Sequence, residues 1–385
     1  MRVKLKDIFD LQMGKTPSRS NLEYWNTTDY KWISIADLTK TSKYIFETKE
    51  YLSKSAIKDS GIKVIPANTV VMSFKLSIGK TAITKEDMYS NEAIMAFKDK
   101  HVINIIPEYI FYLFKYKNWE ECSNKAVMGK TLNKATLSEI EVEICSIEKQ
   151  RQIVNILDKI MSAVDGRKQE LQLLDELIKA RFVEMFGDPV KNPKGWEVVT
   201  IGDIVTEVRY GTSKPAVEGG KYPYLRMNNL TADGHLDLND LKYIDIPDDE
   251  IEKCVVRKGD VLFNRTNSIE LVGKTVVFDL QEDMIIAGYI IRVRLNKRLL
   301  PEILSQYMNL EALKDILRSM AKGAVNQANI NAQELQSIKV YIPDMELQKQ
   351  FIEMKNQVDK SKVAVQKALD ETQMLFDSLM QEYFG

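Results

Sequence analysis

Four copies of a Gly-Lys-Thr tripeptide raise the question of nucleotide binding, because a glycine followed by a lysine can bind phosphate groups. The copies lie at residues 14–16, 79–81, 129–131 and 273–275. A phosphate loop also needs a glycine five residues before the Gly-Lys pair, since bare backbone amides must wrap the phosphates. The residues at those positions are Phe9, Phe74, Asn124 and Ser268. None is glycine, so the sequence argues against a nucleotide-binding enzyme.

Residues for metal or nucleophilic chemistry are sparse. The two histidines and three cysteines are dispersed, with no CxxC pair, so neither a zinc site nor a disulfide framework is predicted. A loose nuclease-like PD...ExK pattern does occur at Pro343, Asp344, Glu353 and Lys355. We expect Glu353 and Lys355 to lie in a long helix, where side chains two residues apart point to different faces. The pattern is therefore interpreted as a solvated helix face, and we expect no catalytic residue and no metal site.

The whole sequence repeats itself with an offset of 194 to 198 residues, which changes how every motif is interpreted. Residues 65–83 (IPANTVVMSFKLSIGKTAI) align with residues 256–277 (VRKGDVLFNRTNSIELVGKTVV), so that Gly79 corresponds to Gly273. From residue 128 onward the offset is a constant 198, and Gln150 corresponds to Gln348. A constant offset means no insertions, which indicates a rigid element.

That element is predicted to be a long helix in each copy. From Ile153 to Met185 apolar residues recur at alternating spacings of three and four, interrupted only by Arg167. This spacing is typical of the seam of a coiled coil. The second seam is weaker, because Lys355, Lys362 and Thr372 interrupt it. A helix of about 40 residues is about 60 Å long, which is typical of a spacer.

Ahead of each helix lie short alternating strands with a few short helices between them. The fold class is therefore predicted to be α+β, with two tandem mixed α/β domains, each followed by a long helix. The predicted boundaries are 1–145 for the first domain, 146–187 for the first long helix, 188–343 for the linker and second domain, and 344–385 for the second long helix.

The composition is that of a soluble globular protein, and the net charge argues against wholesale coating of nucleic acid. The net charge of -1 averages a mildly basic segment, residues 1–145, and an acidic one, residues 344–385. A local stripe of lysine and arginine, rather than the net charge, is what counters DNA phosphates. The longest apolar stretches, such as residues 284–291, are too short to span a membrane. Because no secretory leader opens the chain, we expect a cytoplasmic location and no membrane partner.

Polar loops at matching places in the two copies suggest two readers of different DNA sequences. Arginine and lysine can bond the edge of guanine, and asparagine and glutamine that of adenine, whereas contacts to phosphate are common to all sequences. We expect the shared lysines, Lys80 and Lys274, to bind phosphate. The candidate DNA-binding residues are Ser73, Lys75, Ser77, Lys80, Lys130 and Asn133 in the first copy, and Asn264, Arg265, Asn267, Lys274, Gln327 and Asn329 in the second. The alternative interpretation is that these are turn-forming asparagines and solvated lysines.

The duplicated order, together with the linker sequence RFVEMFGDPVKNPKGWEVVTIGDI at residues 181–204, resembles the specificity subunit of Type I restriction-modification enzymes. Residues 14–38 (GKTPSRSNLEYWNTTDYKWISIADL), 262–275 (LFNRTNSIELVGKT) and 323–331 (GAVNQANIN) look like parts of that family's target recognition domains. The resemblance covers essentially the whole chain.

The resemblance implies a DNA-binding subunit without catalytic activity, whose two target recognition domains each read half of a bipartite site in double-stranded DNA. It implies that the two long helices pack as an antiparallel coiled coil. It also implies partners, namely methylation subunits, which are adenine N6-methyltransferases, and ATP-dependent restriction subunits. S-adenosylmethionine, ATP and magnesium would bind to those partners, and no cofactor to this chain. The competing hypothesis is a stand-alone single-chain DNA-binding regulator or coiled-coil adaptor.

Overall fold

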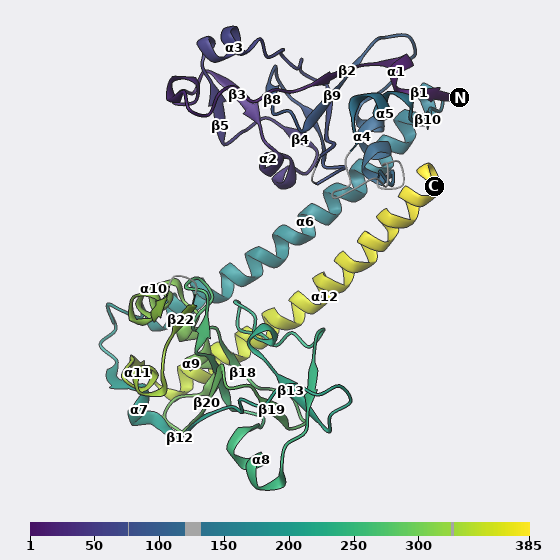
Figure 1. Ribbon diagram of the computed structural model, residues 1–385. Helices are drawn as coiled ribbons and strands as arrows, with labels where there is room; N and C mark the ends of the chain where they lie inside the picture. The colour runs from purple at the N-terminus through teal and green to yellow at the C-terminus, as the bar shows by residue number, and fades with distance from the viewer. Residues whose placement is uncertain (76, 120–131, 325–326) are drawn as a thin grey trace. The chain divides into compact units, whose positions relative to one another are not determined.

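The protein is described by a computed structural model that covers residues 1–75, 77–119, 132–324 and 327–385 (Figure 1). Contacts divide it into two compact units. Unit 1 comprises Met1–Gly166 and Ala368–Gly385, and unit 2 comprises Arg167–Lys367. Each unit combines β-sheets with helices, so the predicted mixed α/β character is confirmed.

Unit 1 contains a five-stranded sheet of order β2-β9-β6-β7-β4, a three-stranded sheet of order β5-β3-β8 and the pair β1-β10. Among the described residues of unit 1, only β4 on β7 and β8 on β3 pair in parallel. The elements are β1 (Arg2–Lys4), α1 (Leu5–Ile8), β2 (Phe9–Met13), η1 (Leu22–Tyr24), β3 (Tyr30–Ile33), α2 (Ile35–Lys40), β4 (Tyr44–Ile45), β5 (Glu50–Leu52), α3 (Lys54–Ser60), β6 (Val70–Ser73), β7 (Thr81–Thr84), β8 (Tyr89–Ser90), β9 (Ile94–Asp99), α4 (Pro107–Tyr116), α5 (Lys134–Glu139) and β10 (Glu141–Glu143).

Unit 2 contains two four-stranded sheets, of orders β12-β20-β16-β18 and β14-β13-β19-β15, the three-stranded sheet β17-β22-β21 and the pair β11-β23. The elements are β11 (Glu197–Thr200), α7 (Ile201–Ile204), β12 (Val205–Tyr210), β13 (Tyr222–Leu225), η2 (Met227–Asn229), β14 (Lys242–Ile244), α8 (Asp248–Cys254), β15 (Val255–Val256), β16 (Val261–Asn264), β17 (Thr266–Asn267), β18 (Thr275–Val277), β19 (Met284–Ile286), β20 (Ile290–Leu295), α9 (Pro301–Met308), α10 (Glu311–Met320), β21 (Lys322–Ala324), β22 (Gln327–Asn329), α11 (Ala332–Gln336) and β23 (Lys339–Ile342).

The two units repeat one strand order, as the sequence alignment predicts. β2-β9-β6-β7 of unit 1 corresponds to β12-β20-β16-β18 of unit 2, and the pair β1-β10 to the pair β11-β23. Among the described residues, β18 has no outer neighbour to match β4 on β7. The proline that starts α4 has its counterpart at the start of α9, where the missing N–H is not needed.

Two 40-residue helices, α6 (Ile147–Phe186) and α12 (Met345–Phe384), follow these sheets in sequence. They begin one residue after the starts at 146 and 344 expected from the sequence. α6 ends as predicted, because Gly187 adopts a left-handed φ of 89° and its N–H donates to Val183 O at 2.8 Å. Glu353 and Lys355 both lie within α12, which bears out the reason for rejecting the nuclease-like pattern.

Within each unit, one end of α6 packs against part of α12. In unit 1, Leu157 and Ile153 share a core with Phe376 and Met380. In unit 2, Phe182 lies edge-on to Phe351, with ring centroids 5.2 Å apart. The start of each helix therefore contacts the end of the other. Ile153, Leu157, Phe351 and Phe376 are seam positions predicted from the sequence, whereas Phe182 and Met380 were not assigned to the seam.

Lys362 shows how a polar residue fits into this seam. Its ammonium lies 2.5 Å from the carboxylate of Asp175 on α6, and its side chain is only 15% exposed. The predicted interruption of the apolar seam is thus occupied by an ion pair between the two helices of unit 2. No helix in the described ranges is both long enough and apolar enough to cross a membrane.

Candidate nucleic-acid interface

The loop that joins β16 to β18 in unit 2 contains most of the candidate residues of the second copy. It is closed by two backbone hydrogen bonds, from Asn264 N–H to Lys274 O and from Gly273 N–H to Asn264 O, both 2.8 Å long. Gly273 has a φ of 82°, a conformation that residues with a side chain rarely adopt. The glycine of this Gly-Lys-Thr copy is therefore needed for a tight turn.

Unit 1 closes its loop between β6 and β7 in the same way. Ser73 N–H donates to Lys80 O and Gly79 N–H donates to Ser73 O, each at 2.9 Å, and Gly79 has a φ of 88°. One further backbone hydrogen bond corresponds in the two units. Leu132 N–H donates to Phe74 O in unit 1, and Ile330 N–H donates to Arg265 O in unit 2. The two loops share one backbone frame, and the interpretation of these two Gly-Lys-Thr copies as one repeated feature is confirmed.

The side chains inside the two frames differ. Ser73 is fully buried, and its hydroxyl accepts a hydrogen bond from Lys80 N–H at 3.0 Å and donates one to Ser77 O. Ser73 thus stabilises the loop from inside. Lys75 is half-buried, with its ammonium 5.3 Å from the Phe74 ring centroid, and Ser77 and Lys80 are exposed.

Asn264 occupies the place of Ser73 in unit 2 and is also fully buried, but neither atom of its amide has a hydrogen-bond partner among the described residues. The hydrogen-bond pattern places Arg265 opposite Phe74, rather than opposite Lys75. The guanidinium of Arg265 lies over the ring of Tyr210, 5.0 Å from its centroid. The second copy thus has a cationic side chain, Arg265, where the first copy has Phe74.

The two lysines that were expected to bind phosphate are not equivalent. The ammonium of Lys274 donates to Leu230 O at 2.7 Å and to Met227 O at 3.4 Å, and burial lowers its pKa. Lys274 therefore connects its loop to η2 in this conformation, and its expected phosphate contact stays a prediction. Lys80 is exposed and free of such contacts within the described residues.

Further candidate residues lie in the segments that precede α5 and α11. Asn133 caps α5 through a 2.8 Å bond from Thr136 N–H, and Asn331 caps α11 through bonds from Gln333 N–H and Glu334 N–H. Their role as turn and cap residues, offered as the alternative interpretation, is what these contacts show. Lys130 lies outside the described residues, and so does the side chain of Gln327.

Two further loop residues join the short sheet β17-β22-β21. Asn267 is partly exposed, and its side-chain oxygen accepts a bond from Ser268 N–H at 2.9 Å. Asn329 accepts a 3.2 Å bond from the Thr266 hydroxyl across the β17-β22 pair. Residues 265–267 and Asn329 therefore meet at one edge of this short sheet, where Thr266 and Asn329 point to one face and Arg265 and Asn267, which alternate with Thr266, point to the other.

Sequence analysis missed two side chains that support this edge. Tyr210, at the end of β12, provides the ring under Arg265, and its hydroxyl accepts a 2.8 Å bond from Ala332 N–H at the start of α11. Lys314, on α10, donates to Gly273 O at 2.6 Å. Neither residue belongs to a repeated motif, so only the three-dimensional contacts reveal them. No cluster of three or more metal-type ligands occurs in the described ranges.

Comparison with known sequences gives a family match over two stretches. Residues 1–176 and 193–372 match the model described as Type I restriction modification DNA specificity domain. The Type I restriction enzyme MjaIX specificity subunit of Methanocaldococcus jannaschii is 30% identical over 59% of this chain and 57% of that protein. The EcoKI specificity subunit of Escherichia coli is 25% identical over 70% of this chain and 62% of that protein. The matches thus span less than two thirds of the length of these relatives.

Solved structures show the same fold. The S subunit of a Type-I restriction-modification system from M. genitalium aligns with a TM-score of 0.54 at 13% identity, covering 100% of this chain and 96% of that one. A chain from a study of assembly and conformational transition of the type I R-M system aligns with a TM-score of 0.60 at 19% identity, covering 100% and 97%. Because the family model matches nearly the whole sequence, the chain belongs to the Type I restriction modification DNA specificity domain family.

Proposed function

We propose that the chain is the sequence-specific DNA-binding specificity subunit of a Type I restriction-modification complex. In this proposal residues 1–145 and 188–343 form two target recognition domains, each of which reads one half of a bipartite site in double-stranded DNA. The long helices 146–187 and 344–385 form an antiparallel coiled coil that separates the domains and carries the partner subunits. The family match and the curated relatives support this assignment.

The observation that carries the proposal is that the two loops share their closing backbone hydrogen bonds but contain different side chains. Both loops are closed by the same pair of backbone hydrogen bonds, yet one presents Lys75 and Ser77 and the other Arg265 and Asn267. Two readers on one scaffold, with different side chains at the same place, are expected to recognise different base sequences.

Arg265 is the strongest single candidate for reading a base. Its guanidinium is fixed over the Tyr210 ring and makes no hydrogen bond to a described residue. A planar guanidinium can donate two parallel hydrogen bonds to the O6 and N7 atoms of guanine. We therefore assign Arg265 to a guanine in the half-site that unit 2 reads.

Catalysis in this proposal belongs to the partners. The chain itself is non-catalytic, and it acts in the cytoplasm with an adenine N6-methyltransferase and an ATP-dependent endonuclease. S-adenosylmethionine, ATP and magnesium are cofactors of those subunits. The alternative, a stand-alone DNA-binding regulator or coiled-coil adaptor, predicts specific DNA binding or helix-mediated association without any methylation partner.

The test is to map the adenines methylated when the chain is present together with its methylation subunit. The parent should methylate one bipartite sequence. Arg265→Ala should relax a single base position in one half-site, because losing a bidentate base contact costs about 1 to 3 kcal/mol, or roughly 5- to 150-fold in discrimination. The other half-site serves as the internal control.

Arg209→Ala is the matched control variant, because Arg209 is an exposed arginine of β12 that pairs with Glu207 outside the loop. It should leave both half-sites unchanged. If Arg265→Ala also leaves both unchanged, the assignment of Arg265 is wrong. If the parent supports no sequence-specific methylation with its partner present, the proposed function itself fails.

A further inference from the structure

A long loop of unit 1 leaves the five-stranded sheet beside the candidate interface. β2 and β6 both pair antiparallel with β9, so both strands end beside Ile94, the residue that begins β9. The loop after β2 comprises residues 14–29 and is longer than its counterpart in unit 2, residues 211–221. That counterpart contains neither arginine nor tryptophan. The loop 14–29 therefore gives unit 1 side chains that unit 2 does not have at this sheet end.

Arg19 in this loop is held on two tryptophan rings. Its guanidinium carbon lies 3.7 Å from the ring centroid of Trp25 and 4.9 Å from that of Trp32. The two rings stand edge-to-face, with their centroids 4.9 Å apart, and Trp32 is buried. A planar guanidinium stacks on aromatic faces, so the rings fix the plane of the Arg19 side chain.

The same tryptophans hold the backbone of the loop. The indole N–H of Trp25 donates to Ser18 O, directly before Arg19, and that of Trp32 donates to Lys15 O, both at 3.1 Å. The peptide that carries Arg19 is thus tied to the rings on which its side chain stacks.

Glu50 orients the guanidinium within that plane. Its carboxylate oxygens accept hydrogen bonds from Nη1 and Nη2 of Arg19, the second at 3.1 Å. Glu50 is the cross-strand neighbour of Trp32 in the β3-β5 pair, so one small sheet supplies both contacts. A guanidinium has five N–H donors. The other three, which include Nε–H, make no hydrogen bond to a described residue, and the Arg19 side chain is 50% exposed.

Arg19 and the loop between β6 and β7 share one carboxylate neighbour. The pKa of Glu92 is lowered, mainly by a hydrogen bond from the Thr16 hydroxyl and further by the charges of Lys75 and Arg19, while burial opposes the change. Both cations act on the same carboxylate, so Arg19 lies on the side of unit 1 that bears the candidate interface.

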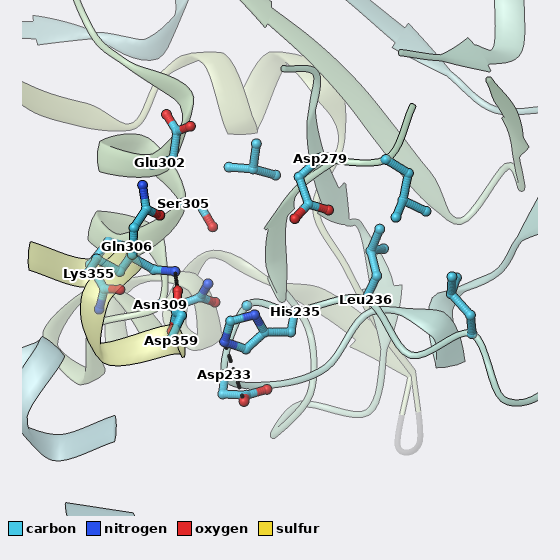
Figure 2. A pocket seen from close by; sticks show the side chains of 15 residues that line it. Asp233, His235, Leu236, Asp279, Glu302, Ser305, Gln306, Asn309, Lys355 and Asp359 are labelled. Atoms are coloured by element: carbon cyan, nitrogen blue, oxygen red, sulfur yellow. Dashed lines mark hydrogen bonds and ion pairs between the residues drawn. The ribbon is translucent and has the colours of Figure 1, made fainter. Parts of the chain in front are cut away.

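Unit 2 shows a contrasting surface at the two ends of β18. Where β18 ends there is a cavity of about 300 Å³, in which carboxylates outnumber Lys355 and His235 (Figure 2). The carboxylates are those of Asp233, Asp279, Glu302 and Asp359. An acidic wall repels phosphate, whereas the loop before β18 bears Arg265, stacked on Tyr210. A stacked arginine at the corresponding sheet end is therefore a feature that both units have.

We propose that Arg19 is the base-reading residue of unit 1 and donates two parallel hydrogen bonds to the O6 and N7 atoms of a guanine. This inference rests on the proposed function, and it places the guanine in the half-site that Arg265 does not read. Trp25 and Glu50 are positioning residues, because a base contact of this kind needs a planar pair of donors in a fixed direction. The two units thus read DNA with arginines from different loops of one scaffold.

The test is to map methylated adenines for Arg19→Ala and Arg19→Lys. Both variants should lower discrimination at one base position about 5- to 150-fold, in the half-site that Arg265→Ala leaves unchanged. Lysine keeps the charge but lacks the planar pair of donors, so it should not restore that position. Arg2→Ala is the matched control, because Arg2 is an exposed arginine of β1 that pairs with Glu141. It should leave both half-sites unchanged.

Circular dichroism verifies that the variants are folded. Methylation that falls equally at all sequences in Arg19→Ala and recovers in Arg19→Lys would show a phosphate contact and overturn base reading. Relaxation in the half-site of Arg265, or no change in either half-site, would also overturn the inference, and the proposed function would stand. If the parent methylates no specific sequence with its partner present, the proposed function and this inference both fail.

Discussion

Lys314 shows how a single side chain with no motif around it can hold a functional loop. Its ammonium donates to Gly273 O and, at 2.9 Å, to the side-chain oxygen of Asn309. Burial, with a smaller contribution from the charge of Arg318, lowers the pKa of Lys314 to about 8, and Glu311 partly offsets the change. The lysine is therefore held charged at neutral pH against a cost in solvation.

This pKa predicts how stability depends on pH. Because the pKa of Lys314 lies below its ordinary value of 10.5, the folded chain binds fewer protons than the unfolded chain between pH 8 and 10.5, and stability should rise with pH in that window. Relative to Lys314→Met, the parent should gain about 2 to 3 kcal/mol of unfolding free energy from pH 8 to 10.5. Urea unfolding of both proteins at several pH values measures the difference. A constant difference across this range would show that Lys314 has an ordinary pKa.

Sequence alone predicted the turns of the candidate site better than its side-chain contacts. The alignment of Gly79 with Gly273 needed only the repeated tripeptide, since a tight turn leaves a local signal. The burial of Asn264 and the binding of Lys274 to η2 depend on residues more than 30 positions away in the chain, which no local pattern reveals. Tyr210 was missed for the same reason.

At the scale of elements, the start of each long helix is fixed by a buried glutamine. Gln150 donates to Asn104 O and Cys145 O and accepts from Ile106 N–H. Gln348 makes the corresponding three bonds to Arg298 O, Pro343 O and Leu300 N–H. Both side chains are 0% exposed. In both copies the glutamine thus binds the start of the long helix to backbone groups that precede it in the chain.

Removing this device should destabilise the fold strongly. Gln150→Leu leaves three buried backbone groups unpaired, and each unpaired group costs about 1 to 3 kcal/mol. We expect a loss of at least about 3 kcal/mol on urea unfolding. Gln152→Leu and Gln350→Leu change exposed glutamines two residues further along and should be nearly neutral. Equal effects of Gln150→Leu and Gln152→Leu would contradict this role.

The elements themselves were largely predictable. The constant repeat offset of 198 residues and the spacing of apolar residues along the seam indicate the long helices. The cap at Gly187 also followed from sequence, since glycine before Asp-Pro marks a helix end. That the segment aligned with β4 forms no strand on β18 in the described residues was not predictable. Two-residue strands leave no periodic pattern, and whether an edge is covered depends on tertiary contacts.

At the scale of the whole molecule, the proposed function makes the paired helices a spacer between two readers. Inserting seven residues after Gly166, together with seven after Lys367, should lengthen the coiled coil by about 10 Å. The unspecified gap in the methylated sequence should then grow by about three base pairs, at about 3.4 Å each. Sequencing of methylated sites measures the gap, and an insertion in only one helix is the control that should abolish methylation. An unchanged gap after the double insertion would refute the spacer role.

The loop frame closed by backbone hydrogen bonds has a consequence for how such a protein can change. The same two bonds enclose five residues between Ser73 and Gly79 but eight between Asn264 and Gly273. The loop can therefore differ in length and sequence while the backbone hydrogen bonds that close it at the sheet stay the same. Under the proposed function, a new DNA preference is expected to arise by substitution or insertion inside the frame without a matching loss of stability, which makes these loops natural positions for a randomised library.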